Sequence, residues 1–279
     1  MTGPIRVVLF GGGPGLERGV RWLLCRLEEH ADVNLLGAVF QSEGETWRHV
    51  ARDLMRRRGL LSVPLLAARI AEEVSGRLSG GHQESAIRRR MSKIRDRMRY
   101  VSDIHAPEVL EHVRTLTPDL GLIYGSPILK PELFTIPTLG TLGIHHGTLP
   151  KYRGKKTTFW EMFHGETHAG VTIQNVNRGL DAGEVVEAGR VRIGSRSRRR
   201  VWFEIESLGV DLYVKAILDI REGAAVFAPQ LGPRYILCRD PSPGQLLRLW
   251  YRQLLARVGS PLPPGPGPAQ KRPRRKRQS

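Results

Sequence analysis

The sequence predicts an α/β protein built around a doubly wound, mostly parallel β-sheet. Segments typical of buried strands alternate with segments of helical periodicity through the first half of the chain, which is the pattern of β–α–β units. The first of them, Ile5 to Phe10, is a continuous apolar run that ends in glycines, as expected of a strand covered on both faces. With 40% hydrophobic residues, the chain can bury a full core.

Apolar periodicity assigns the remaining elements. Continuous apolar runs predict three more buried strands, at Val33–Phe40, Asp119–Gly125 and Gly140–His146. Alternating patterns predict two later strands, expected to be antiparallel, at Ala169–Val176 and Glu184–Ile193. Apolar residues at steps of three and four predict helices at Leu16–Glu29, Thr46–Arg58, Val63–Val74, Glu84–Arg99, Pro107–Leu116, Thr157–Phe163, Val201–Glu222 and Gln245–Arg257. A loop is expected at Gly76–Gly81. The last helix is expected to turn five side chains inward, those of Leu246, Leu247, Trp250, Leu254 and Leu255.

These elements predict three regions along the chain. Residues 1–200 are expected to form the α/β domain, and residues 201–258 a helical C-terminal extension packed on it. Residues 259–279 are rich in proline and glycine and then strongly basic, so this tail is expected to be disordered.

Net charge is the most unusual global property of the chain, at +17. Two segments concentrate it: the predicted helix at Glu84–Arg99, and the tail at Lys271–Arg277, which has no acidic residue. Such segments attract polyanions such as RNA through a salt-sensitive electrostatic term. A solvated basic surface without a nucleic-acid partner explains them equally well.

The compartment expected from the sequence is the cytoplasm. No apolar run is long enough to span a bilayer, and the N-terminus lacks the pattern of a secretory signal. The two cysteines, Cys25 and Cys238, are not spaced for a disulfide framework or a zinc site.

A glycine-rich turn follows the first strand, at Gly11–Gly15. Leu16 stands where a dinucleotide fingerprint needs its third glycine, and Gln41 stands where it needs an acid after the second strand. A nicotinamide or flavin dinucleotide is therefore disfavoured. The turn is expected to be a tight β–α connection, and Gly12 can also form the floor of a substrate site.

The residues that could take part in a reaction follow the ends of the later strands. His145 ends a predicted buried strand, and Asp181 lies in a turn between Gly179 and Gly183. Alone, each has an ordinary structural explanation, as a core histidine and as a turn aspartate. Ligands of doubly wound sheets bind at the carboxyl ends of strands, so together the two residues indicate an imidazole–carboxylate pair in an active site.

The motifs around this pair resemble the N10-formyltetrahydrofolate-dependent formyltransferases, a family that includes the methionyl-tRNA formyltransferases. In that family, Asn-x-His at a strand end precedes a Leu-Pro loop with Tyr-Arg-Gly and a later Leu-Asp-x-Gly. The matching residues here are His145, Leu149–Pro150, Tyr152–Gly154 and Leu180–Gly183. The resemblance extends over about Ile5 to Ile193. It implies a Rossmann-like formyltransferase fold and an enzyme that moves a formyl group from 10-formyltetrahydrofolate to a primary amine.

The resemblance also implies roles for individual residues. The catalytic residues would be His145 and Asp181, with Thr172 at the position of a family hydroxyl. The residues that would line the folate site are Ile123, Tyr124, Gly125, Ile128, Leu129, Val176 and Leu180. The residues that would face the acceptor are Gly12, His146, Gly147 and Arg153. No metal is expected, because no ligand spacing indicates one.

The chain departs from the family pattern at Gly143, where the family has its asparagine. That asparagine helps to hold the developing oxyanion, and losing one such donor costs about 2.7–4 kcal/mol of transition-state stabilisation. His146, Thr148 and Thr172 are candidate replacements, and a glycine also lets a backbone amide or a water approach.

A second departure leaves the acceptor open. Residues 201–257 predict helices instead of the C-terminal β-barrel that helps methionyl-tRNA formyltransferases to hold tRNA. The acceptor is therefore either an aminoacyl-tRNA or a small amine such as an amino sugar. Two further alternatives are a formyltetrahydrofolate hydrolase and a catalytically decayed, RNA-binding relative.

Overall fold

The computed structural model describes residues 3–12, 18–42, 81–232 and 237–257, which form two compact units, Met1–Thr141 and Leu142–Ser279. The strand order is β3-β2-β1-β4-β5-β6-β7 in a seven-stranded sheet. The predicted α/β fold with a mixed, mostly parallel sheet and C-terminal helices is confirmed. The predicted division at residues 200 and 258 stays a prediction.

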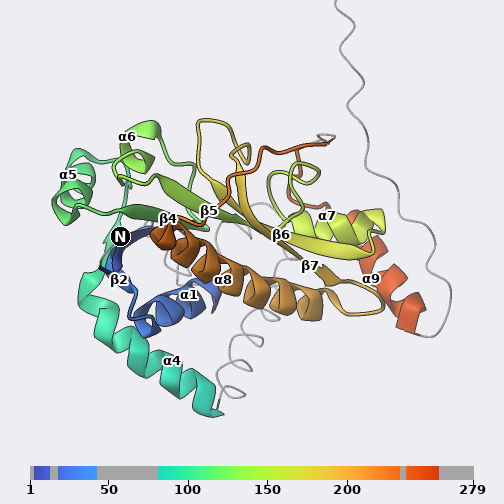
Figure 1. Cartoon of the computed structure of the whole chain (residues 1–279). Helices are drawn as coiled ribbons and strands as arrows, with labels where there is room; N and C mark the ends of the chain where they lie inside the picture. The colour runs from blue at the N-terminus through green and yellow to red at the C-terminus, as the bar shows by residue number, and fades with distance from the viewer. Residues whose placement is uncertain (1–2, 13–17, 43–80, 233–236, 258–279) are drawn as a thin grey trace, which may run out of the picture. The chain divides into compact units, whose positions relative to one another are not determined.

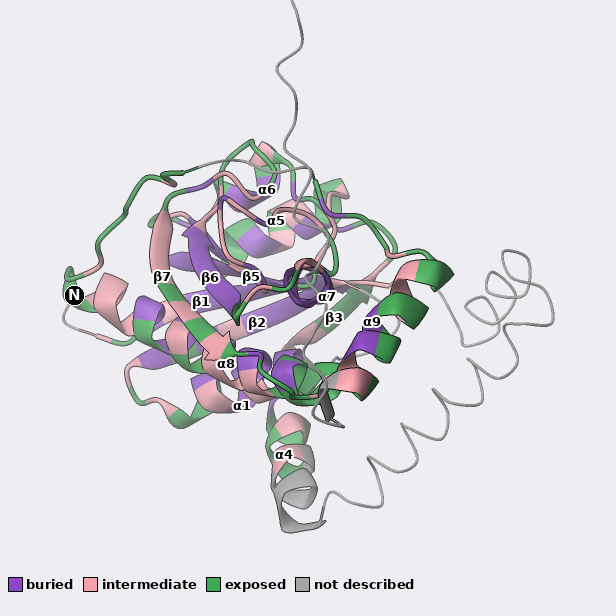
Figure 2. Cartoon of the chain, turned by 90° about the vertical axis from the view of Figure 1, so that its right-hand side faces the viewer, coloured by how far each residue is buried: buried purple, intermediate pink, exposed green. Residues whose placement is uncertain are grey.

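The first unit is the parallel part of the fold. Its strands are β1 (Ile5–Gly12), β2 (Val33–Gln41), β3 (Met98–Val101) and β4 (Leu120–Tyr124). The pairs β3–β2, β2–β1 and β1–β4 are all parallel. β1 and β2 are buried along most of their length, as their apolar runs predict (Figure 2). The helices are α1 (Arg18–Glu29), α4 (Gly81–Ile94), α5 (Pro107–Leu116) and the short α6 (Pro131–Phe134), and α1 and α4 lie side by side (Figure 1).

The basic helix predicted at Glu84–Arg99 is wrong at its C-terminal end. Helix α4 stops at Ile94, a single 3₁₀ turn follows at Arg95–Arg97, and the chain then forms the edge strand β3. Arg97 fixes this break, because its guanidinium donates to the Leu35 carbonyl at 2.6 Å and pairs with Glu28 at 2.8 Å. The short edge strand therefore replaces the last turn of the predicted helix.

The second unit contains the antiparallel part of the fold. Strand β5 (Thr141–His145) begins at the boundary, and β6 (His168–Asn175) and β7 (Val185–Arg192) follow as the predicted antiparallel strands. Its helices are α7 (Thr157–His164), α8 (Arg198–Glu222) and α9 (Pro243–Arg257). Helix α8 packs on β6 and β7, and its Tyr213 hydroxyl donates to the Leu142 carbonyl at 2.7 Å.

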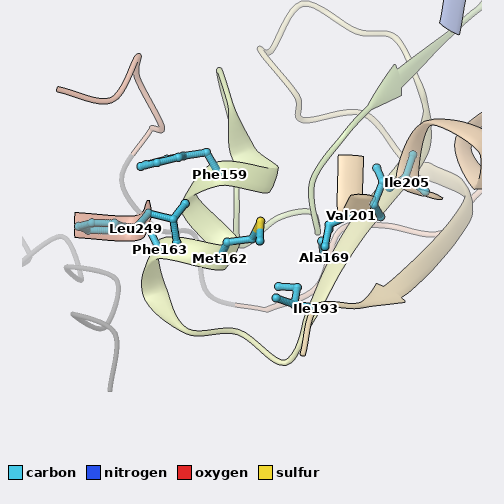
Figure 3. Close-up of a cluster of buried hydrophobic side chains, with 9 residues drawn as sticks. Phe159, Met162, Phe163, Ala169, Ile193, Val201, Ile205 and Leu249 are labelled. Carbon is cyan, nitrogen blue, oxygen red and sulfur yellow. The ribbon is translucent and has the colours of Figure 1, made fainter. Parts of the chain in front are cut away.

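A compact apolar cluster joins α7, α8 and α9 to β6 (Figure 3). Its buried members are Phe159, Met162, Phe163, Ala169, Val171, Ile193, Val201, Ile205 and Leu249. This cluster holds α7 against β6. It therefore fixes the C-terminal end of the segment that connects His145 to α7.

The inward face predicted for α9 is only partly correct, because Leu246 packs against the apolar cluster while Leu247, Trp250 and Leu254 are exposed. Leu247 and Trp250 are 64% and 59% exposed, whereas Leu249 and Arg252 are each 5% exposed (Figure 2). The Arg252 guanidinium donates to the Phe163 carbonyl at 2.6 Å, at the C-terminal end of α7. This bond to a carbonyl in the last turn of α7 turns the Arg252 face inward, and Leu247 and Trp250 outward.

Several predicted segments lie outside the described residues. These are most of the glycine-rich turn after Gly12, the helices at Thr46–Arg58 and Val63–Val74, the loop before Gly81, and the tail from Gly259 onward with its basic segment.

Candidate active site

The candidate site is built on one face of the β5–β6 pair. In the antiparallel register, His145 lies directly opposite Thr172, and Gly143 lies directly opposite Gln174. Directly opposed residues of an antiparallel pair, and residues two apart on one strand, point to the same face. His145, Thr172 and Gln174 therefore share a face with Gly143, the one position of the four that has no side chain.

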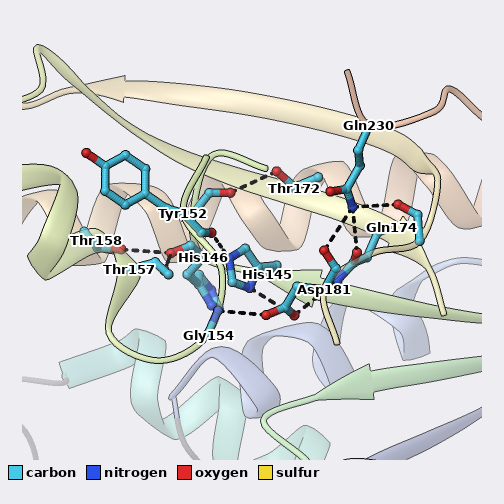
Figure 4. Close-up of polar contacts among 12 residues, drawn as sticks. His145, His146, Tyr152, Gly154, Thr157, Thr158, Thr172, Gln174, Asp181 and Gln230 are labelled. Carbon is cyan, nitrogen blue, oxygen red and sulfur yellow. Dashed lines mark hydrogen bonds and ion pairs between the residues drawn. The ribbon is translucent and has the colours of Figure 1, made fainter. Parts of the chain in front are cut away.

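The His145 ring is held between two acceptors (Figure 4). Its Nε2 lies 2.7 Å from the Tyr152 carbonyl oxygen, and its Nδ1 lies 3.4 Å from Asp181 Oδ1. A carbonyl only accepts, so Nε2 carries a proton. Both acceptors are satisfied together only when Nδ1 carries a proton as well, which is the imidazolium form. The backbone of Tyr152 sets the ring orientation, and the Asp181 carboxylate lies beside a potential acid.

The turn that carries Asp181 is shaped by its backbone. Asp181 has a φ of +47°, in the left-handed region that aspartate tolerates better than most residues. Its carboxylate accepts from the Gly154 amide at 2.8 Å and from Gln174 Nε2 at 3.4 Å. A Cβ at Gly183 would lie 1.5 Å from the Asn175 carbonyl oxygen, so only glycine fits there. The Leu-Asp-x-Gly sequence thus places the carboxylate beside His145, as predicted from the two strand ends.

Thr172 and Gly147 have structural contacts that bear on their predicted roles. The Thr172 hydroxyl donates to the Gly147 carbonyl at 2.9 Å. A Cβ on Gly147 would lie 2.8 Å from His145 Nε2 and from the Thr157 side chain. Gly147 therefore lets the loop after β5 pass close to the imidazole, and Thr172 ties that loop to β6.

Glu161 is a buried carboxylate that sequence reasoning missed. It is 0% exposed and accepts from the Thr148 amide at 2.9 Å, the Thr148 hydroxyl at 2.8 Å and the Gly170 amide at 3.1 Å. Burial raises its pKa to about 7, although these hydrogen bonds oppose the rise. A glutamate inside the apolar helical sequence Phe-Trp-Glu-Met-Phe was the signal available. Glu161 fixes the loop after His145 to β6.

We expect Glu161 to make the stability of the protein fall as the pH rises from about 4.5 to about 7. Over this range the folded state binds a proton at Glu161 that the unfolded state has released, so the unfolding free energy decreases, by about 3 kcal/mol at most. Urea denaturation at a series of pH values measures this slope. Glu161→Gln should flatten it, whereas the exposed Glu132→Gln should leave it unchanged. A slope unaltered in Glu161→Gln would contradict the assignment.

His146 and Thr148 were candidates to replace the donor missing at Gly143. Burial and the neighbouring His145 lower the pKa of His146 to about 3, so this imidazole is neutral at physiological pH, and its ring centroid lies 4.8 Å from that of Trp202. The Thr148 hydroxyl donates its proton to Glu161, and that of Thr172 to Gly147. Neither hydroxyl proton is available to a substrate in this arrangement.

The residues predicted to line the folate site lie in both units. In the first unit, Tyr124 and Leu129 are buried, Ile123 is half-buried, and Ile128 is 74% exposed. Gly125 has a φ of +62° and open space where a Cβ would be. In the second unit, Val176 is half-buried and Leu180 is 41% exposed. Packing leaves each of these two apolar side chains, Ile128 and Leu180, uncovered within its own unit.

Gly12 and Arg153 are the remaining residues predicted to face the acceptor. A Cβ at Gly12 would lie 2.9 Å from Pro127 Cδ, so a close approach requires this glycine. The Arg153 Nε is buried and has no hydrogen-bond partner among the described residues.

Within the described ranges, no helix is long and apolar enough to cross a membrane, and no group of three or more His, Cys, Asp or Glu side chains could hold a metal ion.

Comparison with known proteins relates part of the chain to a protein family. Residues 82–217 match the family model described as Formyl transferase. The methionyl-tRNA formyltransferase of Chloroflexus aggregans is 35% identical over 127 residues, which are 44% of this chain and 41% of the relative. That of Ruminiclostridium cellulolyticum is 30% identical over 130 residues, 46% of this chain and 41% of the relative. The matched segment thus spans about two-fifths of the length of these relatives.

Solved structures share the fold at low sequence identity. Glycinamide ribonucleotide transformylase 1 from Symbiobacterium toebii is 15% identical, with a TM-score of 0.57 over 83% of this chain and 96% of that one. HypX from Aquifex aeolicus, in complex with tetrahydrofolic acid, is also 15% identical, with a TM-score of 0.55 over 88% of this chain and 34% of that one. The matched region and these relatives together identify residues 82–217 as a formyl transferase domain and the chain as a distant homologue of the methionyl-tRNA formyltransferases.

Proposed function

We propose that this protein is an N-formyltransferase that moves the formyl group of 10-formyltetrahydrofolate to a primary amine. The observation that carries the proposal is the His145–Asp181 pair, with 3.4 Å between Nδ1 and Oδ1, held by the Tyr152 carbonyl and the Gly154 amide. Family membership supports the same reaction class. The uncovered Leu180 side chain, which belongs to the same unit as this pair, suits a bound pterin.

The proposed reaction is an acyl transfer through a tetrahedral centre. A neutral amine attacks the formyl carbon, the new C–N bond forms, and the formyl oxygen takes negative charge. The His145 imidazolium stabilises this oxygen, or gives its proton to N10 and then takes the proton that the amine loses. Either role requires the Nε2 proton to leave the Tyr152 carbonyl for the reacting group. The bond from carbon to N10 of the folate then breaks, N10 takes a proton, and the products are a formamide and tetrahydrofolate. The Asp181 carboxylate, 3.4 Å from His145 Nδ1, fixes the orientation of the ring.

The proposed acceptor is an aminoacyl-tRNA or a small anionic amine. The relatives are named as methionyl-tRNA formyltransferases, and a structure of the same fold is named as a glycinamide ribonucleotide transformylase. The unpartnered Arg153 Nε is a donor suited to a phosphate or carboxylate. Exposed basic side chains on and after α4, such as Arg89, Lys93 and Arg95, favour a nucleic-acid partner. Two unpaired thiols, Cys25 and Cys238, accord with a cytosolic enzyme.

A panel of acceptors tests the proposal. Charged tRNAs, amino sugars and amino acid derivatives are each incubated with the protein and 10-formyltetrahydrofolate, and tetrahydrofolate release is followed by absorbance. We expect release only when a suitable amine is present. Release without any amine would instead indicate a hydrolase. Absence of release with every amine, combined with RNA binding that weakens steeply with salt, would indicate a decayed, RNA-binding relative.

A further inference from the structure

Gln174 places a carboxamide opposite Gly143, the position without a side chain on the face of the β5–β6 pair that carries His145. It lies directly opposite Gly143 on β6, and its side chain shares the face of His145 and Thr172. It is 7% exposed, so water does not solvate the amide freely. Opposed Cβ positions in such a pair are about 4.5–5.5 Å apart, so a long side chain at Gln174 reaches the strand position of Gly143. The position without a side chain on one strand is thus opposed by a polar side chain on its neighbour.

The orientation of this carboxamide follows from its neighbours. Gln230 Nε2 contacts three oxygens: the Gly183 carbonyl at 2.7 Å, the Asp181 carbonyl at 3.2 Å and Gln174 Oε1 at 3.2 Å (Figure 4). Backbone carbonyls only accept, so the NH₂ end of Gln230 must face them. Gln174 must then turn its oxygen to Gln230 and its NH₂ to the Asp181 carboxylate. The network therefore presents the donor end of Gln174 to the His145–Asp181 pair.

One of the two N–H groups of Gln174 remains for a ligand. The first points to Asp181 Oδ1 at 3.4 Å, the same oxygen that faces His145 Nδ1 at 3.4 Å. His145 Nε2 is bound to Tyr152, and the hydroxyl protons of Thr148 and Thr172 point to their own acceptors. Among the described side chains of this face, Gln174 is consequently the neutral donor best placed beside the imidazole.

We propose that Gln174 donates a hydrogen bond to the oxyanion of the tetrahedral centre, together with His145, and that Gln230 is the positioning residue that fixes its amide. This inference rests on the proposed formyl transfer. A developing oxyanion needs more than one preorganised donor in a water-poor site, and the nearby Asp181 carboxylate repels it. A carboxamide offsets that repulsion without adding charge. It therefore stabilises the oxyanion and leaves the imidazolium–carboxylate pair intact.

Paired substitutions test this role. Gln174→Met keeps an unbranched side chain of similar length and removes the donor. We expect it to lower kcat by about 10²–10³-fold. The dissociation constant for tetrahydrofolate, measured by calorimetry, should not change, because that product has no formyl oxygen. Gly143→Asn in the Gln174→Met background returns a carboxamide from the opposite strand and should recover at least about ten-fold of the lost kcat. Gln253→Met on α9 is the control and should retain wild-type kcat.

Gln230→Met tests the positioning role separately. It leaves the Gln174 amide free to flip, so kcat should fall part of the way while tetrahydrofolate binding stays unchanged.

The outcomes separate this inference from the proposed function. If the wild type transfers formyl groups and His145→Ala does not, but Gln174→Met retains wild-type kcat, Gln174 is not the oxyanion donor and formyl transfer stands. A Gln174→Met variant that loses tetrahydrofolate affinity together with kcat, and that Gly143→Asn does not rescue, also overturns the inference, since its effect is then on folding or folate binding. A wild type that transfers no formyl group to any amine overturns both proposals.

Discussion

His145→Ala is expected to lower kcat for amine-dependent formyl transfer by about 10²–10⁴-fold. In the proposed reaction His145 is the charged donor, and its ring is held by the Tyr152 carbonyl and the Asp181 carboxylate. Its removal takes away both the oxyanion contact and the route for the amine proton. Steady-state release of tetrahydrofolate at saturating folate and amine measures the effect.

A matched histidine on the same sheet controls for surface effects. His168 begins β6, and its exposed ring lies 2.9 Å from the Thr167 hydroxyl, on the surface. His168→Ala should therefore retain wild-type kcat. Near-normal turnover in His145→Ala, with its folded state verified by circular dichroism, would refute the assignment of His145 as catalytic.

Asp181→Asn is expected to reduce kcat by about 10²–10⁴-fold, with little change in stability. Asparagine tolerates the left-handed backbone of this position and has nearly the same shape, so the substitution isolates the negative charge. Without that charge the His145 ring loses its carboxylate partner at 3.4 Å, and the Gly154 amide loses its charged acceptor at 2.8 Å. Steady-state release of tetrahydrofolate at saturating folate and amine measures the loss.

The control for this substitution is Asp219→Asn on α8. Asp219 pairs with Lys215 at 2.6 Å on the surface, so loss of its charge should leave kcat unchanged. Equal rates for Asp181→Asn and Asp219→Asn would show that the Asp181 charge has no part in catalysis.

Elements with one dominant local signal were predictable from the sequence. The bounds of α5 match the prediction because Pro107 starts the helix and a left-handed Thr117 ends it. The buried strands follow from continuous apolar runs. Strand β3 was not predictable, because Met98–Val101 has no alternation and its break from α4 depends on Arg97 reaching Leu35 and Glu28. The face of α9 depends in the same way on one distant bond, from Arg252 to Phe163.

The same distinction between local and long-range signals applies to the residues of the candidate site. Proximity of His145 and Asp181 was predicted because both residues follow strand ends, and the structure brings them together. Gln174 was missed because its place opposite Gly143 is a matter of strand register, which a single sequence does not reveal. Gln230 was missed because it reaches the site from a segment with no regular structure. Long-range pairing, and not local pattern, completes this site.

Transfer of an isotope-labelled formyl carbon tests the central claim most directly. 10-Formyltetrahydrofolate with a labelled formyl group is incubated with the full-length protein and an active amine from the panel, and the products are identified by mass spectrometry. We predict a labelled formamide in a one-to-one ratio with tetrahydrofolate, formed by the wild type and absent with His145→Ala. Label that appears as free formate, or a labelled formamide produced equally by His145→Ala, would contradict a formyl transfer carried by the His145–Asp181 pair.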